Sequence, residues 1–199
     1  MLLYDSAVSG NCYKVRLLFA HLGIEYERRA VDVVDRSSRR EVLGDLNPAL
    51  RVPTLVLDDG RPLAESNAIL WYFGEGTRFV PDDRYEQAQI LQWMFFEQYE
   101  HEPALAVARF LLTYSGRPEL YEERREELTK RGEGVLEKME RHLDGRDWLV
   151  DNRMTLADIS LYAYTHVADE GGFSLDGYPA INRWLARVAA EPGHVPIDA

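Results

Sequence analysis

ALRVPTLVLDDGRPLAESNAILW, residues 49–71, is the most informative stretch of the sequence. It places a Val-Pro pair before an apolar strand, then a turn with two acids, a short return strand and a Glu-Ser pair where a helix starts. Val52 offers backbone hydrogen bonds to an extended ligand, and Pro53 lacks an N–H and can turn the chain sharply, also through a cis bond. Ser66 stands at the expected N-cap, where helix amides can take a carboxylate, and Glu65 can pair with an ammonium group. These features predict a site for a small, extended peptide that carries a free ammonium and carboxylates.

Three motifs of the chain resemble the cytosolic glutathione transferases. NPALRVPTL (47–55) followed by LAESNAI (63–69) is similar to the glutathione-binding half of that family. SGNCYKVR (9–16) resembles the active-site loop of its serine-type classes, which are zeta-, theta- and tau-like, and MTLADIS (154–160) resembles the capping box of its helical domain. The motifs occur in the order and spacing of the family, so the resemblance, to bacterial-type members, covers nearly the whole chain.

Composition excludes several classes of protein. The 199 residues carry a net charge of −11, which argues against binding to nucleic acid because phosphate neutralisation needs a basic surface. No stretch approaches the roughly 20 apolar residues of a membrane span. The N-terminus reaches Asp5 without a basic region, which is unlike a signal peptide, and the single cysteine fits a reducing compartment. We expect a cytoplasmic protein without nucleic-acid or membrane partners.

The pattern of apolar residues and breakers predicts three parts: residues 1–75, a linker at 76–83 and residues 84–199. The first part has the order β-α-β-α-β-β-α, and the resemblance makes it a thioredoxin-like glutathione-binding domain. The last part has only helical periodicity, which predicts an all-helical C-terminal domain. Its expected helices cover residues 84–113, 120–143, 155–167 and 179–190.

One expected helix carries its own start signal. Thr155 and Asp158 have the spacing of a capping box, in which each side chain binds the backbone of the other. A lost cap costs on the order of 1 kcal/mol or more. We therefore expect Asp158 to serve folding rather than chemistry.

Ser9 is the expected catalytic residue. Glutathione attacks electrophiles as a thiolate, and a free thiol has a pKa of about 8.5, so an enzyme must lower it. A hydroxyl that donates to the sulfur and the N-terminus of a helix that starts near Asn11 both favour the charged form. The resemblance places Ser9 on the catalytic serine of the family, while Ser6 and Tyr4 remain weaker alternatives.

Cys12 offers a second chemistry. Ser9-Gly10-Asn11-Cys12 overlays the redox C-x-x-C of thioredoxin-like folds with its first cysteine replaced. A cysteine at a helix N-terminus can have a lowered pKa and exchange disulfides, whereas the alternative is a small, half-buried helix residue.

The other site residues are implied by the resemblance. The glutathione-binding residues are Asn11, Arg39 (with Arg40 as its alternative), Arg51, Val52, Pro53, Glu65 and Ser66. A pocket for the second substrate is expected between the two halves, with Tyr13, Phe96, Tyr99, Arg109, Tyr114 and Tyr164 as candidates. No metal is expected. Lys14 and His101 are expected on solvated faces, His101 with a dimer contact as its alternative.

The resemblance implies a homodimeric glutathione S-transferase that adds its co-substrate glutathione to small hydrophobic electrophiles. Alternatives are a glutathione-dependent disulfide oxidoreductase, peroxidase or isomerase, and a non-catalytic glutathione-binding regulatory protein. The sequence does not name the physiological electrophile.

Overall fold

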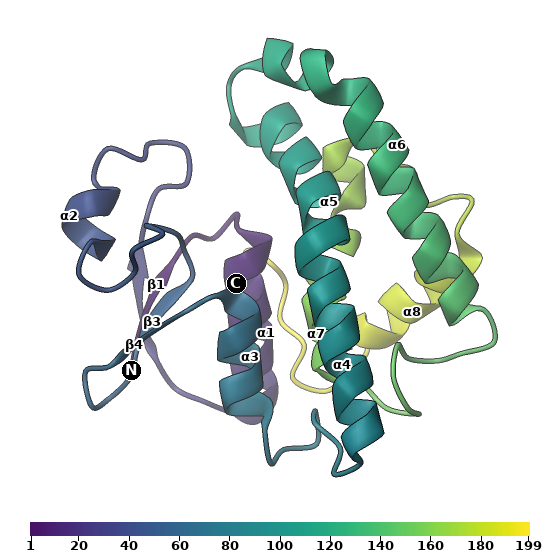
Figure 1. The fold of residues 1–199 in the computed structure, drawn as a ribbon, viewed down its shortest axis with the longest axis horizontal. Coiled ribbons are helices and arrows are strands. Elements are labelled where there is room, and N and C mark those ends of the chain that lie inside the picture. Colours follow the sequence, from purple (N-terminus) through teal and green to yellow (C-terminus); the bar gives the residue numbers. More distant parts are fainter. The chain divides into compact units, whose positions relative to one another are not determined.

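The computed structural model describes residues 1–199, apart from the side chain of residue 118, and the chain divides into two compact units. Unit 1 consists of Met1–Glu75 together with Pro192–Ala199, and unit 2 consists of Gly76–Glu191 (Figure 1). We expected the second domain to extend to residue 199. Instead, the segment from Pro192 onward packs along a helix of unit 1, because several side chains of that unit bind its carbonyl groups.

Unit 1 is built on a mixed sheet of four strands in the order β2-β1-β3-β4. Strand β1 pairs in parallel with β2 and antiparallel with β3, which pairs antiparallel with β4. Its elements in chain order are β1 (Leu2–Asp5), α1 (Gly10–Leu22), β2 (Glu27–Ala30), α2 (Arg39–Leu43), β3 (Thr54–Val56), β4 (Pro62–Ala64) and α3 (Ser66–Gly74). This order confirms the predicted thioredoxin-like fold.

Helices α1 and α3 lie side by side on one face of the sheet, and α2 lies on the other (Figure 1). The first face buries Leu3 and Leu55 of the sheet against Val15, Phe19 and Ile69 of the two helices. The second face carries a smaller hydrophobic cluster with Tyr4, Val31 and Leu43 at its centre. The sheet and the α1–α3 pair therefore form the rigid base of unit 1.

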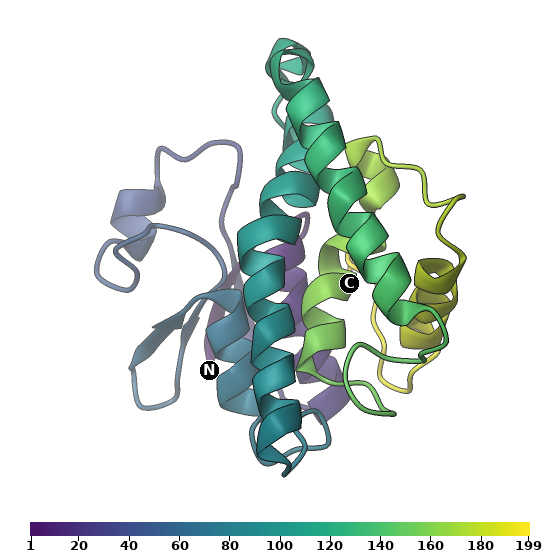
Figure 2. The ribbon, with the colours of Figure 1, turned by 45° about the vertical axis from the view of Figure 1, so that its right-hand side comes forward.

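Unit 2 is helical, as predicted. Its helices are α4 (Arg84–Phe96), α5 (Glu102–Arg109), α6 (Pro118–Leu143), α7 (Leu156–Thr165) and α8 (Pro179–Ala189), with a short 3₁₀ turn at Ala168–Gly171. The single helix expected over 84–113 is continuous from α4 through α5 (Figure 2), but π-helical turns at Glu97–His101 and Phe110–Tyr114 interrupt its α-helical bonding. Among the described residues, no helix has the length and apolar character needed to cross a bilayer.

His101 corrects the expectation of a solvated side chain. It is fully buried in unit 2, and its Nε2 lies 2.8 Å from the hydroxyl of Thr165 on α7. The π-helical turn carries both His101 and the buried Glu97, whose carboxylate accepts a hydrogen bond from Ser160 of the same helix α7. Packing of α7 against this turn is the physical reason for the burial.

Asp158 forms the predicted capping box at the start of α7. Its carboxylate accepts hydrogen bonds from the amide of Thr155 at 2.8 Å and from the Thr155 hydroxyl at 3.0 Å. It also accepts from the amide of Leu149 at 3.0 Å and from the indole of Trp184 at 2.9 Å. Burial raises the pKa of Asp158 to about 6, and the hydrogen bonds oppose that rise. This single carboxylate thus ties α7 to α8 and to the preceding loop.

Candidate functional site

Ser9 lies at the N-cap of α1, at the end of the loop that leaves β1. Its backbone is extended, with φ −81° and ψ 119°, and its Oγ accepts a hydrogen bond from the amide of Cys12 at 3.3 Å. Its own amide donates to the carbonyl of Ser6 at 3.0 Å. A hydroxyl that accepts with a lone pair keeps its proton for a second partner, so Ser9 can cap the helix and donate to a ligand at the same time.

Cys12 is fully buried in the first turn of the same helix. Burial, with a smaller contribution from the nearby carboxylate of Asp5, raises the pKa of the Cys12 thiol to about 12. The thiol is therefore protonated at neutral pH. These properties are typical of a structural cysteine rather than of an attacking one.

The Val52–Pro53 peptide bond is cis. The turn around it is fixed by Asn47, whose amide nitrogen donates to the carbonyl of Arg51 and to the hydroxyl of Thr54, both at 3.0 Å. Among the described residues, none forms a backbone hydrogen bond with Val52. The predicted pairing of the Val52 backbone with an extended peptide stays a prediction.

Glu65 holds an unusual backbone conformation at the start of α3. Its φ is 68° and its ψ is 114°, a region that side chains with a β-carbon rarely adopt, and its side chain is exposed. Such a residue costs on the order of 1–3 kcal/mol, and strain of this kind clusters at functional sites. The sequence predicted Ser66 as the N-cap, but Glu65 occupies that position and Ser66 is the first residue of the helix.

A buried cation lies next to Ser66. The Lys14 side chain is fully buried, contrary to the expected surface position, and its Nζ donates to Ser66 Oγ at 3.5 Å. Ser66 in turn donates to Asn11 Oδ1 at 3.3 Å. These contacts join the N-terminal turns of α1 and α3, because the packing of the two helices brings residues 11 and 66 together.

Two arginines were predicted to bind the ligand, and they differ in solvent exposure. Arg39 is nearly buried, and its guanidinium donates to the carbonyls of Leu50, Asp32 and Val33 at 3.2–3.4 Å. Burial is the main cause that lowers the pKa of Arg39. Arg51 is exposed beside the cis turn and is the accessible cation.

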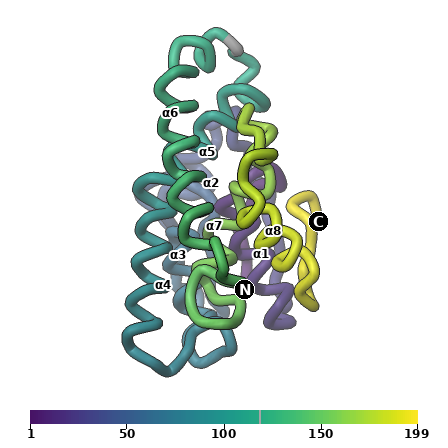
Figure 3. The backbone as a smooth tube through the Cα atoms, turned by 90° about the vertical axis from the view of Figure 1, so that its right-hand side faces the viewer, coloured from purple at the N-terminus to yellow at the C-terminus, as the bar shows by residue number. Residues whose placement is uncertain are grey.

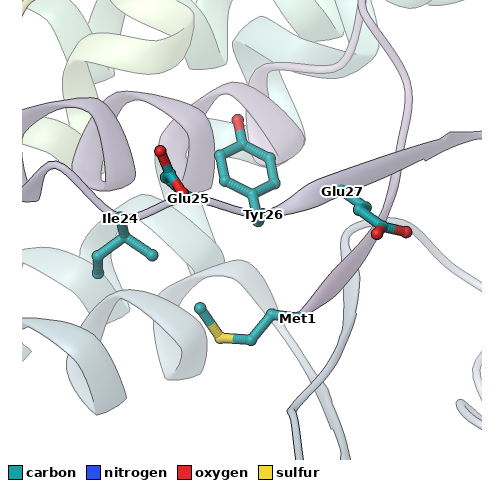
Figure 4. A pocket seen from close by; sticks show the side chains of 5 residues that line it. All are labelled: Met1, Ile24, Glu25, Tyr26 and Glu27. Carbon is teal, nitrogen blue, oxygen red and sulfur yellow. The ribbon is translucent and has the colours of Figure 1, made fainter.

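The strand register gathers these parts at one end of the sheet. Tyr4 of β1 pairs with Thr54 of β3, which pairs with Ala64 of β4. The loop to Ser9, the cis turn and Glu65 therefore all leave the sheet at the same end. The hollow lined by Met1 and residues 24–27 (Figure 4) lies at the opposite end, where β1 and β2 begin, and contains none of the predicted residues.

The residues predicted for the second substrate have varied surroundings. Tyr13 is buried and its hydroxyl donates to the carbonyl of Val195 at 2.7 Å. In unit 2, Arg109 is buried against Glu170, and both bind the hydroxyl of Tyr114. Tyr164 is buried, Phe96 is half-buried and Tyr99 is 82 % exposed.

Comparisons with known proteins identify the family of the chain. The family described as "Glutathione S-transferase, N-terminal domain" matches residues 8–75, and "Glutathione S-transferase, C-terminal domain" matches residues 103–192. The crystal structure of a glutathione S-transferase from Pseudomonas fluorescens Pf-5 is 48 % identical, with 98 % of each chain covered and a TM-score of 0.93. One from Xanthobacter autotrophicus Py2 is 41 % identical over 98 % of this chain and 96 % of that one, also with a TM-score of 0.93.

Among curated proteins, elongation factor 1-gamma from Artemia salina is 30 % identical over 92 % of this chain and 43 % of its own length. The chain spans 43–65 % of the length of the first curated relatives that it matches. The two family matches and the bacterial structures, which align over almost their whole length, show that the chain belongs to the cytosolic glutathione S-transferase superfamily.

Proposed function

We propose that the chain is a glutathione transferase that binds glutathione at this end of the sheet and activates its thiol through Ser9 and the N-terminus of α1. The observation that carries the proposal is the placement of Ser9, whose Oγ caps α1 while its proton remains available to a ligand. The names of the bacterial relatives, which are glutathione S-transferases, support the same activity.

Each charged end of glutathione has a matching group. The γ-glutamyl ammonium faces the carboxylate of Glu65, and its carboxylate faces the first amides of α3 at Ser66. The buried ammonium of Lys14 adds positive charge near this point. The cysteinyl backbone pairs with Val52 beside the cis bond, and the glycyl carboxylate faces Arg51.

The activation step needs no formal base. A hydrogen bond from Ser9 and the positive end of the α1 dipole both stabilise the thiolate relative to the thiol, so the thiol pKa falls and its proton leaves to water. The thiolate sulfur then forms a bond to the electrophilic carbon of a small hydrophobic substrate, and the leaving group departs with its electron pair.

The test compares Ser9→Ala with Cys12→Ser and wild type in conjugation of a haloaromatic substrate. Removing one preorganised donor typically costs about 10²–10³-fold in kcat. We expect a loss of that size in Ser9→Ala, with the Kd of glutathione little changed, and full activity in Cys12→Ser. Unchanged kcat in Ser9→Ala would refute the role of Ser9.

A second candidate function is glutathione binding without turnover, favoured by one observation: a relative at 30 % identity is named elongation factor rather than transferase. Calorimetric titration with glutathione separates the two. Binding with no conjugation and no disulfide exchange in wild type would support the non-catalytic alternative.

We also propose a homodimer, which is typical of the family. On α4 and the turn that follows it, Tyr85, Phe95 and Tyr99 are 72 %, 68 % and 82 % exposed. At helical spacing these three positions fall on one side of the continuous helix that begins with α4. Exposed aromatic side chains of this kind are enriched in protein interfaces.

A further inference from the structure

Arg16 is a buried guanidinium that the glutathione site, as described above, does not use. It is 3 % exposed and pairs with the equally buried Asp5 at 2.6 Å. The same guanidinium donates to the carbonyl of Ser6 at 3.3 Å, of Ala7 at 3.1 Å and of Ile197 at 2.5 Å. One side chain thus holds the end of β1, the loop before Ser9 and the C-terminal segment.

Arg16 is linked to Ser9 by two hydrogen bonds that share one acceptor. The Ser6 carbonyl that accepts from Arg16 also accepts from the amide of Ser9 at 3.0 Å. The position of the Ser6 carbonyl therefore fixes where the N-cap of α1 sits. Since a hydrogen bond weakens steeply with distance and angle, a small shift of this carbonyl changes the direction of the Ser9 hydroxyl.

Residues 192–199 lie along α1 (Figure 3) and are held there by donors from unit 1. Tyr13 donates to the carbonyl of Val195 at 2.7 Å, and Arg28 donates to that of Ala199 at 2.7 Å. Nδ1 of His21 lies 2.9 Å from the carbonyl of Pro192. These contacts flank the Ile197 carbonyl that Arg16 binds, so the whole segment is anchored from both sides of Arg16.

We propose that Arg16 is a positioning residue for Ser9 and that residues 192–199 form a strap that keeps its guanidinium in place. Arginine suits this role because its planar fork can donate to several acceptors in fixed directions, whereas lysine is a compact point charge. In Arg16→Lys the ion pair with Asp5 can persist, but the bridge between the loop and the strap is lost. The effect on thiol activation rests on the proposed function; the mechanical coupling of strap and loop does not.

The coupling is tested without glutathione by hydrogen exchange on the full chain. We expect the amides of Ser9 and Ala199, which donate to the carbonyls of Ser6 and Pro196, to exchange faster together in Arg16→Lys, by about tenfold, the effect of one lost hydrogen bond of about 1.4 kcal/mol. Arg28→Lys is the matched control, because Arg28 binds the other oxygen of Asp5 and the strap at Ala199 but no loop carbonyl. Loop exchange that is unchanged in Arg16→Lys, or equally fast in Arg28→Lys, would overturn the proposal.

Tyr13→Phe tests the strap separately and keeps the test decisive if Arg16→Lys folds poorly. It removes the two strap contacts of the Tyr13 hydroxyl, to the Val195 carbonyl and to His194, and leaves every Arg16 contact chemically possible. Faster exchange in both the strap and the loop supports the coupling. Faster exchange in the strap alone contradicts it.

The positioning of Ser9 is tested by the absorbance of bound glutathione against pH. We expect the thiol pKa to rise by about one unit in Arg16→Lys, a tenfold loss of thiolate, with the Kd of glutathione within about twofold of wild type and no shift in Arg28→Lys. A thiol pKa that stays at the wild-type value would overturn the positioning role. Absence of thiolate in wild type would instead refute the proposed function, while the exchange result would still decide the coupling.

Discussion

Replacing Glu65 by glycine is expected to stabilise the protein and to weaken glutathione binding. Glu65 adopts φ 68° and ψ 114°, where a β-carbon is strained by about 1–3 kcal/mol. Glycine removes this strain but costs about 0.5–1 kcal/mol in extra freedom of the unfolded chain. The net gain is about 1 kcal/mol at mid-range and at most about 2.5 kcal/mol, and each kcal/mol raises Tm by about 2–4 °C for a chain of this size.

The same change removes the carboxylate proposed to meet the ligand ammonium. A hydrogen bond to a charged group is worth about 1.5–3 kcal/mol, so the Kd of glutathione should rise by about 10–100-fold. Glu65→Ala is the matched control: it loses the same carboxylate but keeps a β-carbon and therefore the strain. Thermal unfolding and calorimetric titration of both variants separate the two effects. A glycine variant no more stable than the alanine variant would refute the reasoning about strain.

Four further predictions concern other parts of the chain. Asp158→Ala should fail to fold or lose most of its stability, measured by chemical denaturation, because three buried N–H donors lose their acceptor at about 1–3 kcal/mol each; normal stability would contradict this. The pKa of Asp158 is about 6 in the folded state against 3.8 in the reference state. The carboxyl group therefore stays protonated to a higher pH in the folded protein than in the unfolded one. The free energy of unfolding, relative to Asp158→Asn, should therefore fall by about 3 kcal/mol in total as pH rises from about 3 to about 7, mostly between about pH 4 and pH 6; an increase over that range would be the opposite of the expected sign. Cys12 should resist alkylation at pH 8 in the native state and react only after unfolding, as followed by mass spectrometry; rapid native labelling would show that its thiol is neither buried nor of high pKa. Phe95→Glu combined with Tyr99→Glu should yield a monomer in sedimentation, with circular dichroism unchanged, whereas a persistent dimer would place the interface elsewhere.

The structural features that the sequence predicted are those formed between residues close together in the chain. The capping box of Thr155 and Asp158 and the sharp turn at Pro53 each involve residues within a few positions of one another. Such signals are visible because the interacting groups are neighbours in the chain. The order of strands and helices in unit 1 followed from periodicity and from the family resemblance.

What the sequence did not predict depends on distant partners. The sequence predicted Lys14 on the surface, but α3 packs against α1 and covers it. It likewise predicted a solvated His101, but α7 covers the π-helical turn that carries this residue. The strap at residues 192–199 gave no signal, because the side chains of unit 1 bind its carbonyls, which every residue possesses. Arg16 was part of a recognised motif, but only the fold shows the four oxygens that it binds.

The thiolate absorbance of bound glutathione at neutral pH, in wild type and in Ser9→Ala, tests the central claim most directly. The account predicts a thiolate signal in the wild-type complex that disappears in Ser9→Ala, while calorimetry shows that glutathione still binds. Bound glutathione without a thiolate signal in wild type, or a signal that survives the loss of the Ser9 hydroxyl, would contradict it.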